Sequence, residues 1–216
     1  MKNNLAALFT QSIYGIVSVE HGAGRNAQEL CAAMLEGGIR IIQYREKYRS
    51  QKIRFEECLL LRKMTHDAGA LFIVNDDIAV ALAVNADGIH LGQDDIPIEE
   101  ARKLIGTDKI IGLSTHAPAQ GLNAVTRGAD YLGVGPVFST KTKANVCDPV
   151  GLEYVRFAAA HIGIPWVAIG GIKENNLVDV IAAGARCTCL VTEITAAYDI
   201  RMTVARLCAN MRLSPK

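Results

Sequence analysis

Eight short apolar runs recur along the whole chain, and a segment with helical spacing follows each of them. The runs span residues 13–19, 39–44, 71–75, 88–91, 110–114, 131–134, 165–169 and 187–191. Their nearly continuous hydrophobicity is typical of strands buried on both faces of a parallel sheet. Eight strand–helix units in succession predict an α/β fold, a single (β/α)8 TIM barrel over residues 1–216. An open doubly wound sheet is the alternative, and residues 1–12 are expected to form an N-terminal extension or an extra helix.

Charge and hydropathy exclude several classes of protein. The 23 basic and 22 acidic residues give a net charge of +1, so no global field would attract nucleic acid. No apolar run approaches the ~18 to 20 residues that span a bilayer, and the N-terminus is too weakly apolar for a secretory signal. We therefore expect a cytoplasmic protein that binds neither nucleic acid nor membrane, and the sequence leaves open whether it forms a homo-oligomer.

The six cysteines include no Cys-x-x-Cys pair. Cys187 and Cys189 lie two residues apart in the last apolar run, so on a strand they would share a face. No histidine or further cysteine is near them in the sequence, and free cysteine commonly packs as a small hydrophobe. Packing is therefore favoured over metal ligation for this pair.

One short loop combines hydroxyl and ammonium groups. Residues 133–143 leave the sixth apolar run through a Gly-Pro turn and carry Thr140, Thr142 and Lys143. Hydroxyl donors and point charges behind glycines suit phosphate oxygens, although a Lys/Thr-rich loop is often only a solvated connection. In a barrel this loop would lie at the C-terminal ends of the strands, where active sites of this fold form. Its neighbours at that end therefore decide between the two interpretations.

Three polar side chains alternate at the end of the second run. Gln43, Arg45 and Lys47 lie two residues apart, so in an extended stretch they point the same way. Arginine offers a bidentate fork and lysine a point charge, a combination that suits a diphosphate. The alternative is that Arg45 and Glu46 only pair with neighbours at the barrel rim.

Acidic pairs follow the third and fourth runs, at 76–77 and 94–95. Because neighbouring strands lie ~4.7 to 4.9 Å apart, these carboxylates could converge on one hard cation. Mg²⁺ fits best, since it favours one or two carboxylates with water and substrate phosphates completing its shell. The alternative is that Asp77 or Asp94 caps a helix.

Two further polar side chains lie on predicted strands. His90 is a candidate to line the pocket, although a lone histidine on a strand is more often a core residue. Ser114 is either a hydrogen-bond donor to an anion or the N-cap of a helix that starts near Ala117. The hydroxyls and imidazole of this region give no support for a hydrolytic triad.

Loops seven and eight complete the candidate site. Gly170 and Gly171 would let backbone N–H groups approach a ligand closely. The segment 191–193 follows the eighth run. These two loops form the usual phosphate cradle of a TIM barrel.

With these motifs in order, the chain resembles the thiamine phosphate synthase family from about residue 14 to residue 197. The resemblance rests on six motifs at compatible spacing, at 43–47, 74–77, 88–95, 112–114, 133–143 and 170–172. It implies a transferase of thiamine biosynthesis that joins hydroxymethylpyrimidine diphosphate to hydroxyethylthiazole phosphate, releasing diphosphate. Its alternatives are a thiazole tautomerase-like isomerase and a noncatalytic barrel that binds phosphorylated ligands.

The resemblance also implies a role for individual residues. The pyrimidine diphosphate would be held by Gln43, Arg45, Lys47, Asn75, Ser114 and Lys143, with His90 lining the pocket; of these, Arg45, Ser114 and Lys143 would be catalytic. Asp76 and Asp95 would bind Mg²⁺. The thiazole phosphate would be held by Thr140, Thr142, Gly171, Val191 and Thr192.

Two segments depart from the family pattern. Glu193 places a carboxylate beside the expected thiazole phosphate site, where like-charge repulsion is expected to weaken binding. The segment 18–25 lacks the acidic turn expected after the first strand. Neither departure touches the expected metal and diphosphate residues.

Overall fold

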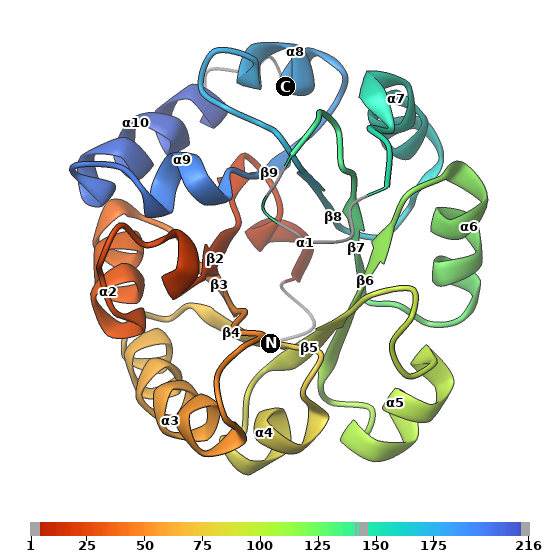
Figure 1. Ribbon diagram of the computed structural model, residues 1–216. Coiled ribbons are helices and arrows are strands. Elements are labelled where there is room, and N and C mark those ends of the chain that lie inside the picture. Colours follow the sequence, from red (N-terminus) through yellow and green to blue (C-terminus); the bar gives the residue numbers. More distant parts are fainter. Residues whose placement is uncertain (1–4, 141, 143–146, 213–216) are drawn as a thin grey trace.

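The computed structural model describes residues 5–140, 142 and 147–212. Its strands form one parallel sheet in the order β1-β9-β8-β7-β6-β5-β4-β3-β2, which curls into a ring with helices outside it (Figure 1). The strands are β1 (Ser12–Ile13), β2 (Gly15–Val17), β3 (Ile41–Tyr44), β4 (Leu71–Asn75), β5 (Gly88–Leu91), β6 (Ile110–Thr115), β7 (Tyr131–Val134), β8 (Trp166–Ile169) and β9 (Cys187–Cys189). The predicted (β/α)8 barrel is confirmed.

The first apolar run, predicted as one strand over 13–19, is two strands. β1 pairs with β9, with Ile13 beside Thr188, whereas β2 pairs with β3, with Ile16 beside Gln43. The chain changes partners at Tyr14, and this change closes the ring. Val19, the last residue of the predicted run, already belongs to a 3₁₀ helix. The last run is also shorter than predicted, because Val191 begins a helix.

Helices other than α1 cover the outside of the ring, and every strand except β1 leads into a helical segment (Figure 1). The helical segments are α1 (Leu5–Leu8), the 3₁₀ helix η2 (Val19–His21), α2 (Ala27–Gly37), α3 (Gln51–Asp67), α4 (Ile78–Ala83), α5 (Ile98–Ile105), α6 (Pro118–Thr126), α7 (Gly151–His161), α8 (Leu177–Ala182), α9 (Val191–Thr195) and α10 (Ile200–Arg212). None of the helices in the described part of the chain is long and apolar enough to cross a membrane.

Helix α2 illustrates how the sequence defines these elements. Asn26 and Glu29 form a capping box, in which each side chain accepts a hydrogen bond from the backbone N–H of the other. Leu30 and Met34, one turn apart, face the barrel and are fully buried, which contributes roughly 1.5 to 3 kcal/mol each. Gly38 ends the helix with φ of 110°, a left-handed conformation that glycine adopts without strain.

The apolar residues form two cores. The larger one lies between the strands and the surrounding helices. The smaller one fills the barrel interior and includes Tyr14, Tyr131, Cys187 and Cys189. Both thiols are buried, and burial raises the pKa of Cys187 to about 12, so they remain protonated and pack as apolar groups. Leu5 of α1 also belongs to this inner core, and α1 lies within the ring in Figure 1.

The strand starts are held by a repeated ionic contact. The Asp87 carboxylate accepts hydrogen bonds from the Phe72 N–H at 2.8 Å and from the Arg62 guanidinium at 2.9 Å. Asp130 makes the equivalent contacts with the Ile111 N–H and with Arg102. A buried carboxylate needs such partners. These groups lie at the N-terminal ends of the strands, the end of this fold associated with stability rather than chemistry.

Candidate active site

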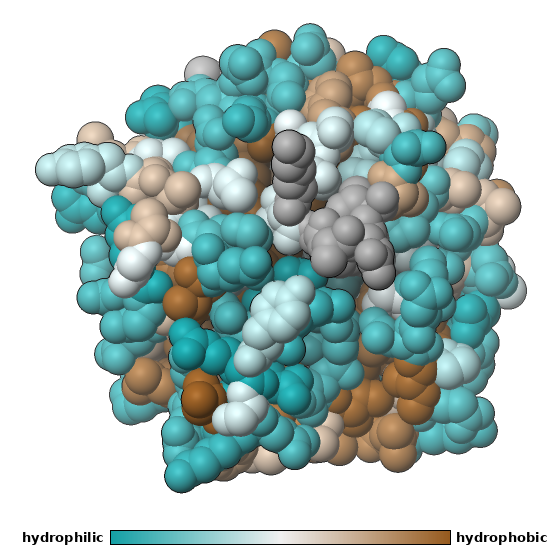
Figure 2. All heavy atoms as spheres, in the orientation of Figure 1, coloured by the Kyte–Doolittle hydropathy of each residue, from teal (hydrophilic) through white to brown (hydrophobic). Residues whose placement is uncertain are grey.

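A cavity of about 450 Å³ opens at the C-terminal ends of the strands. Figure 2 shows this face of the molecule, where mostly hydrophilic side chains surround the centre. Ten of the predicted site residues line the cavity: Gln43, Arg45, Asn75, His90, Ser114, Thr140, Thr142, Gly171, Val191 and Thr192. Apolar side chains from the barrel interior, among them Ile16, Val167 and Ile169, complete its wall. Polar and apolar side chains thus share the wall of the cavity.

The first polar side chains of the cavity come from the end of β3. Gln43 is buried, and its amide nitrogen donates to the Tyr14 hydroxyl at 2.9 Å. Arg45 lines the cavity, whereas Glu46 turns away and accepts a hydrogen bond from the Val19 N–H. Lys47 lies outside the cavity lining. The rim-pairing alternative therefore applies to Glu46 and not to Arg45.

The predicted acidic pair converges. Asp76 follows β4 with φ of 60°, a strained conformation for a residue other than glycine. Burial, then the hydrogen bond and like charge of Asp95, raise the pKa of Asp76. Asp95 is oriented by the Gly92 N–H, which donates to its carboxylate at 2.6 Å, and the Lys47 ammonium lies 3.4 Å from Asp76. Two adjacent carboxylates that repel one another fit a divalent cation such as Mg²⁺, because its charge would offset that repulsion.

Asp77, the neighbour of Asp76, has a structural role. Its carboxylate accepts from the Val80 N–H at 2.9 Å and so caps helix α4. It also pairs with the Arg54 guanidinium at 2.9 Å. The helix-capping alternative is thus correct for Asp77, and the two carboxylates that approach each other are those of Asp76 and Asp95.

A chain of hydrogen bonds crosses the barrel interior beneath the cavity. The Tyr14 hydroxyl, which accepts from Gln43, lies 2.8 Å from the Tyr131 hydroxyl. The Tyr131 hydroxyl lies 2.8 Å from His90 Nδ1, and His90 Nε2 lies 2.9 Å from Ser114 Oγ. Burial raises the pKa of both tyrosines well above 10, so both phenols stay neutral. The imidazole of His90 is thus tied to both the inner core and the cavity wall.

Ser114 is not a helix cap. Helix α6 begins at Pro118, and its N-cap residue, Ala117, has no side-chain capping bond. The Ser114 hydroxyl instead lies against His90 and the cavity, and its carbonyl accepts from the Gln93 side chain at 2.6 Å. The N-cap alternative was wrong because the helix starts four residues later, beyond the reach of this side chain.

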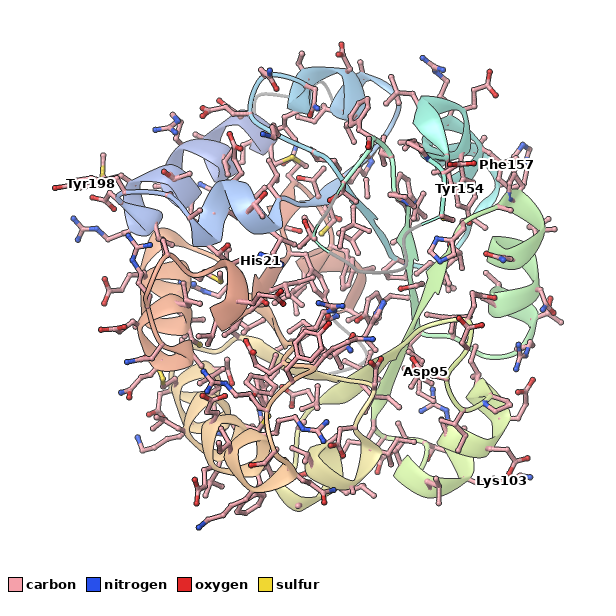
Figure 3. The ribbon with its side chains drawn as sticks, in the orientation of Figure 1. His21, Asp95, Lys103, Tyr154, Phe157 and Tyr198 are labelled. Carbon is pink, nitrogen blue, oxygen red and sulfur yellow. The ribbon has the colours of Figure 1, made fainter. Side chains whose placement is uncertain are left out.

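The loop after β7 brings its threonines to the cavity. The hydroxyls of Thr140 and Thr142 lie 3.0 Å apart. His21, from η2, lies 3.3 Å from the Thr142 carbonyl through Nε2, and it comes from a different side of the barrel mouth than Asp95 (Figure 3). Lys143, predicted to hold diphosphate, lies outside the described residues. The two hydroxyls therefore form a small cluster of donors at the cavity wall.

Gly171 allows loop seven to approach this threonine loop. It has φ of 63°, and a Cβ placed there would lie 2.5 Å from the Ser139 carbonyl oxygen. Any side chain at this position would therefore push the two loops apart. The sequence predicted that a ligand would approach the backbone of Gly171 closely. In the structure Gly171 lines the cavity and also lies against the backbone of Ser139.

Glu193 is turned away from the cavity. Its carboxylate accepts from the Glu174 N–H at 3.3 Å, and it is not among the residues that line the cavity. The segment 18–25, which departs from the family pattern, contributes Ser18 and His21 to the lining. The Arg25 guanidinium donates to carbonyl oxygens that follow α9, including that of Ala197 at 2.8 Å.

Several cavity residues were not predicted from the sequence. These are Tyr14, Ser18, His21, Cys147 and Lys173. Each except Cys147 lies in or just after an apolar run, so position at a strand end was the available signal. Tyr131 was also missed, because a tyrosine within an apolar run looks like an ordinary core residue.

Comparisons with known proteins agree on one family. The sequence matches the family described as thiamine monophosphate synthase over residues 13–194. It is 53% identical over 206 residues to the thiamine-phosphate synthase of Pelotomaculum thermopropionicum, covering 95% of this chain and 94% of that protein. It is 50% identical to that of Caldicellulosiruptor bescii, with the same coverage of both chains. The solved thiamine phosphate pyrophosphorylase from Pyrococcus furiosus superposes with a TM-score of 0.85 at 34% identity, covering 95% of this chain and 98% of that one.

Proposed function

The chain belongs to the thiamine monophosphate synthase family, and we propose that its cavity joins hydroxymethylpyrimidine diphosphate to hydroxyethylthiazole phosphate. The products are thiamine phosphate and diphosphate. The observation that carries this proposal is the presence of two kinds of anion-binding group in the lining of one cavity, the threonine hydroxyls and Arg45. The threonine hydroxyls lie on one loop. The paired carboxylates of Asp76 and Asp95 follow β4 and β5; they are not among the lining residues, but Asp76 comes directly after Asn75, which is. Two phosphorylated reactants need two such groups.

The pyrimidine diphosphate is assigned to the side of the cavity formed by β3, β4 and β6. Gln43 contributes a buried amide that can recognise a ring nitrogen or amino group. Arg45 offers two parallel N–H donors to the diphosphate oxygens, and Ser114 offers a hydroxyl. Asn75 lines the same region, and Lys143 would add a further positive charge. These groups hold the leaving group as negative charge develops on it.

Asp76 and Asp95 would hold Mg²⁺, which when bound supplies positive charge to the diphosphate. Lys47, 3.4 Å from Asp76, provides a second positive charge beside this carboxylate. The role of the protein here is to orient the diphosphate and to neutralise its charge, which is electrostatic rather than covalent catalysis.

The reaction needs one bond broken and one formed. The bond between the pyrimidine methylene carbon and the diphosphate oxygen breaks, and its electron pair leaves with the diphosphate. The lone pair of the thiazole nitrogen then forms the new carbon–nitrogen bond, so no proton has to be removed from the nucleophile. Thr140, Thr142, Gly171, Val191 and Thr192 are assigned to the thiazole phosphate, and they would set the distance and angle of the attack.

The apolar part of the cavity wall has a role in this scheme. Water would compete with the thiazole nitrogen for the electron-poor methylene carbon. Ile16, Val167 and Ile169 line the cavity and offer no hydrogen-bonding group to hold a water molecule there. This apolar part of the wall therefore favours coupling over hydrolysis.

The test is to incubate the purified protein with both substrates, with Mg²⁺ or with a chelator, and to measure thiamine phosphate. We expect product only when both substrates and Mg²⁺ are present. Absence of product under every metal condition would refute the synthase assignment, and isomerisation of the thiazole alone would support the tautomerase alternative.

A matched pair of variants tests the metal assignment. We expect Asp95→Asn to lose the Mg²⁺-dependent activity, because it removes half of the carboxylate pair. We expect Asp77→Asn to keep it, since this side chain caps α4 and retains an oxygen that can accept from the Val80 N–H. Equal losses in the two variants would contradict the assignment of Asp95 to the metal.

A further inference from the structure

The hydrogen-bond chain beneath the cavity has a direction. Its members are Gln43, Tyr14, Tyr131, His90 and Ser114, joined in that order at 2.9, 2.8, 2.8 and 2.9 Å. All but Ser114 are at least nine-tenths buried, so water from the surface does not easily replace a missing partner. The positions of the hydrogens in such a chain follow from the requirement that every buried donor has an acceptor.

The Gln43 amide fixes the direction at one end. Its nitrogen can only donate, so the Tyr14 oxygen accepts that bond. Among the described residues, the Tyr131 oxygen is then the one acceptor in reach of the Tyr14 hydroxyl hydrogen. Tyr131 therefore accepts from Tyr14 and turns its own hydrogen to His90 Nδ1. The reverse order would leave the Tyr14 hydrogen buried without an acceptor.

We propose that Tyr131 is a positioning residue, which places the His90 proton on Nε2 and thereby turns the Ser114 hydroxyl hydrogen into the cavity. With its Nδ1 accepting from Tyr131, a neutral His90 carries its proton on Nε2 and donates to Ser114 Oγ. Ser114 then accepts from His90, and its own hydrogen is available to an anionic ligand. This last step rests on the proposed function, whereas the tautomer of His90 does not.

The packing around Tyr131 supports a positioning role. The residue is 1% exposed and lies beneath the cavity lining, so it acts on a ligand only through other side chains. Its ring packs against Phe9 at 5.0 Å and His90 at 5.4 Å between centroids. Gly112 leaves the space for this ring, because a Cβ there would lie 2.2 Å from it. The backbone is thus shaped so that the hydroxyl reaches His90.

The direct test is the tautomer of His90 in the wild-type protein. Nitrogen-15 NMR of histidine-labelled protein distinguishes protonated from unprotonated ring nitrogens. The His90 signals are assigned by comparison with His90→Gln, which leaves the other four histidines in place. We expect a protonated Nε2 and an unprotonated Nδ1 in the substrate-free protein. A proton on Nδ1, alone or together with Nε2, would overturn the proposal whether or not the protein is a synthase.

The second test compares Tyr131→Phe with Tyr154→Phe. Tyr154 is a matched control because its buried hydroxyl also donates to another hydroxyl, that of Thr115 at 2.7 Å, but it lies on α7 in the outer ring (Figure 3). We expect Tyr131→Phe to give mixed His90 tautomers and about a tenfold loss of turnover, the size expected for one buried hydrogen bond. The KM for the thiazole phosphate should not change. Tyr154→Phe should preserve both the tautomer and the turnover.

A double variant separates positioning from a general loss of structure. If Tyr131 acts through Ser114, the double variant Tyr131→Phe/Ser114→Ala should have a turnover within a factor of about two of that of Ser114→Ala alone. Multiplicative losses, or an unchanged His90 tautomer in Tyr131→Phe, would overturn the proposal. If the wild-type protein makes no thiamine phosphate, the proposed function fails, and the NMR experiment alone decides the role of Tyr131.

Discussion

Replacing Gly112 by alanine would add one methyl group to β6 at the place where the Tyr131 ring packs. The new Cβ would lie 2.2 Å from the ring carbon Cζ and 2.5 Å from the hydroxyl oxygen. Relief to the roughly 3.4 Å of ordinary contact requires a shift of about 1.2 Å. The ring cannot yield cheaply, because Phe9, Tyr14 and His90 pack around it. Either β6 or the Tyr131 side chain must therefore move.

The magnitude follows from the contacts that such a shift disturbs. Overpacking a core by one methyl group costs about 1 to 3 kcal/mol. The two 2.8 Å hydrogen bonds of Tyr131, to Tyr14 and His90, would each lose about 1 kcal/mol. We therefore expect Gly112→Ala to lower the free energy of unfolding by about 3 to 5 kcal/mol. Turnover should fall as well, since the displaced hydroxyl no longer orients His90.

Urea denaturation followed by circular dichroism measures this loss, with Gly163→Ala as the matched control. A Cβ at Gly163 would meet nothing within 4 Å, and its φ is not in the left-handed region, so that variant should be as stable as the wild type. If Gly112→Ala had the same urea midpoint as Gly163→Ala, the close packing of Tyr131 against β6 and the role assigned to its hydroxyl would both be refuted.

Three further variants test the charges. Without metal, Asp95→Asn should be at least as stable as the wild type, because the substitution removes the negative charge that raises the pKa of Asp76. In thermal denaturation, Mg²⁺ should stabilise the wild type but not this variant. The hydrogen bond from Arg127 lowers the pKa of Glu99 from 4.5 to about 2, so this pair stabilises the fold above the ordinary pKa and stops doing so as the pH falls toward 2. The difference in urea midpoint between wild type and Glu99→Gln should therefore be largest near neutral pH and vanish by about pH 2; a constant difference would contradict this. Glu193→Gln should leave the KM for the thiazole phosphate unchanged, since this carboxylate faces loop seven. A clear decrease in KM would instead support the charge repulsion that the sequence predicted.

The barrel was predictable because strands buried on both faces must be apolar almost throughout. The break at Tyr14 was not, since it depends on which strand meets which when the ring closes. Asp76 and Asp95 were correctly expected to approach each other, because their strands are neighbours in the sheet. The direction of a side chain was harder to infer. Glu193 follows a strand end as the cavity residues do, yet its carboxylate turns to a backbone N–H outside the lining.

Buried tyrosines were the main omission from the predicted site. An apolar run that contains tyrosine predicts a strand but not the partner of its hydroxyl, which comes from strands distant in the sequence. Tyr14 and Tyr131 are 117 residues apart and meet inside the ring. Ser114 shows the same limit, because its two candidate roles differed only in where the next helix begins.

The split first strand also bears on how the chain assembles. Most strand pairs join nearby segments: Ile41 lies beside Leu71, 30 residues along the chain. The pair of Ile13 and Thr188 spans 175 residues, so closing that loop costs about 1.6 kcal/mol more in chain entropy. This contact has the largest sequence separation in the sheet, and we expect it to form late in folding because its loop closure costs the most chain entropy. Tyr14 therefore reaches its place beneath the cavity only when the C-terminal strand docks, and ligand binding should emerge with the complete ring rather than with any partial barrel.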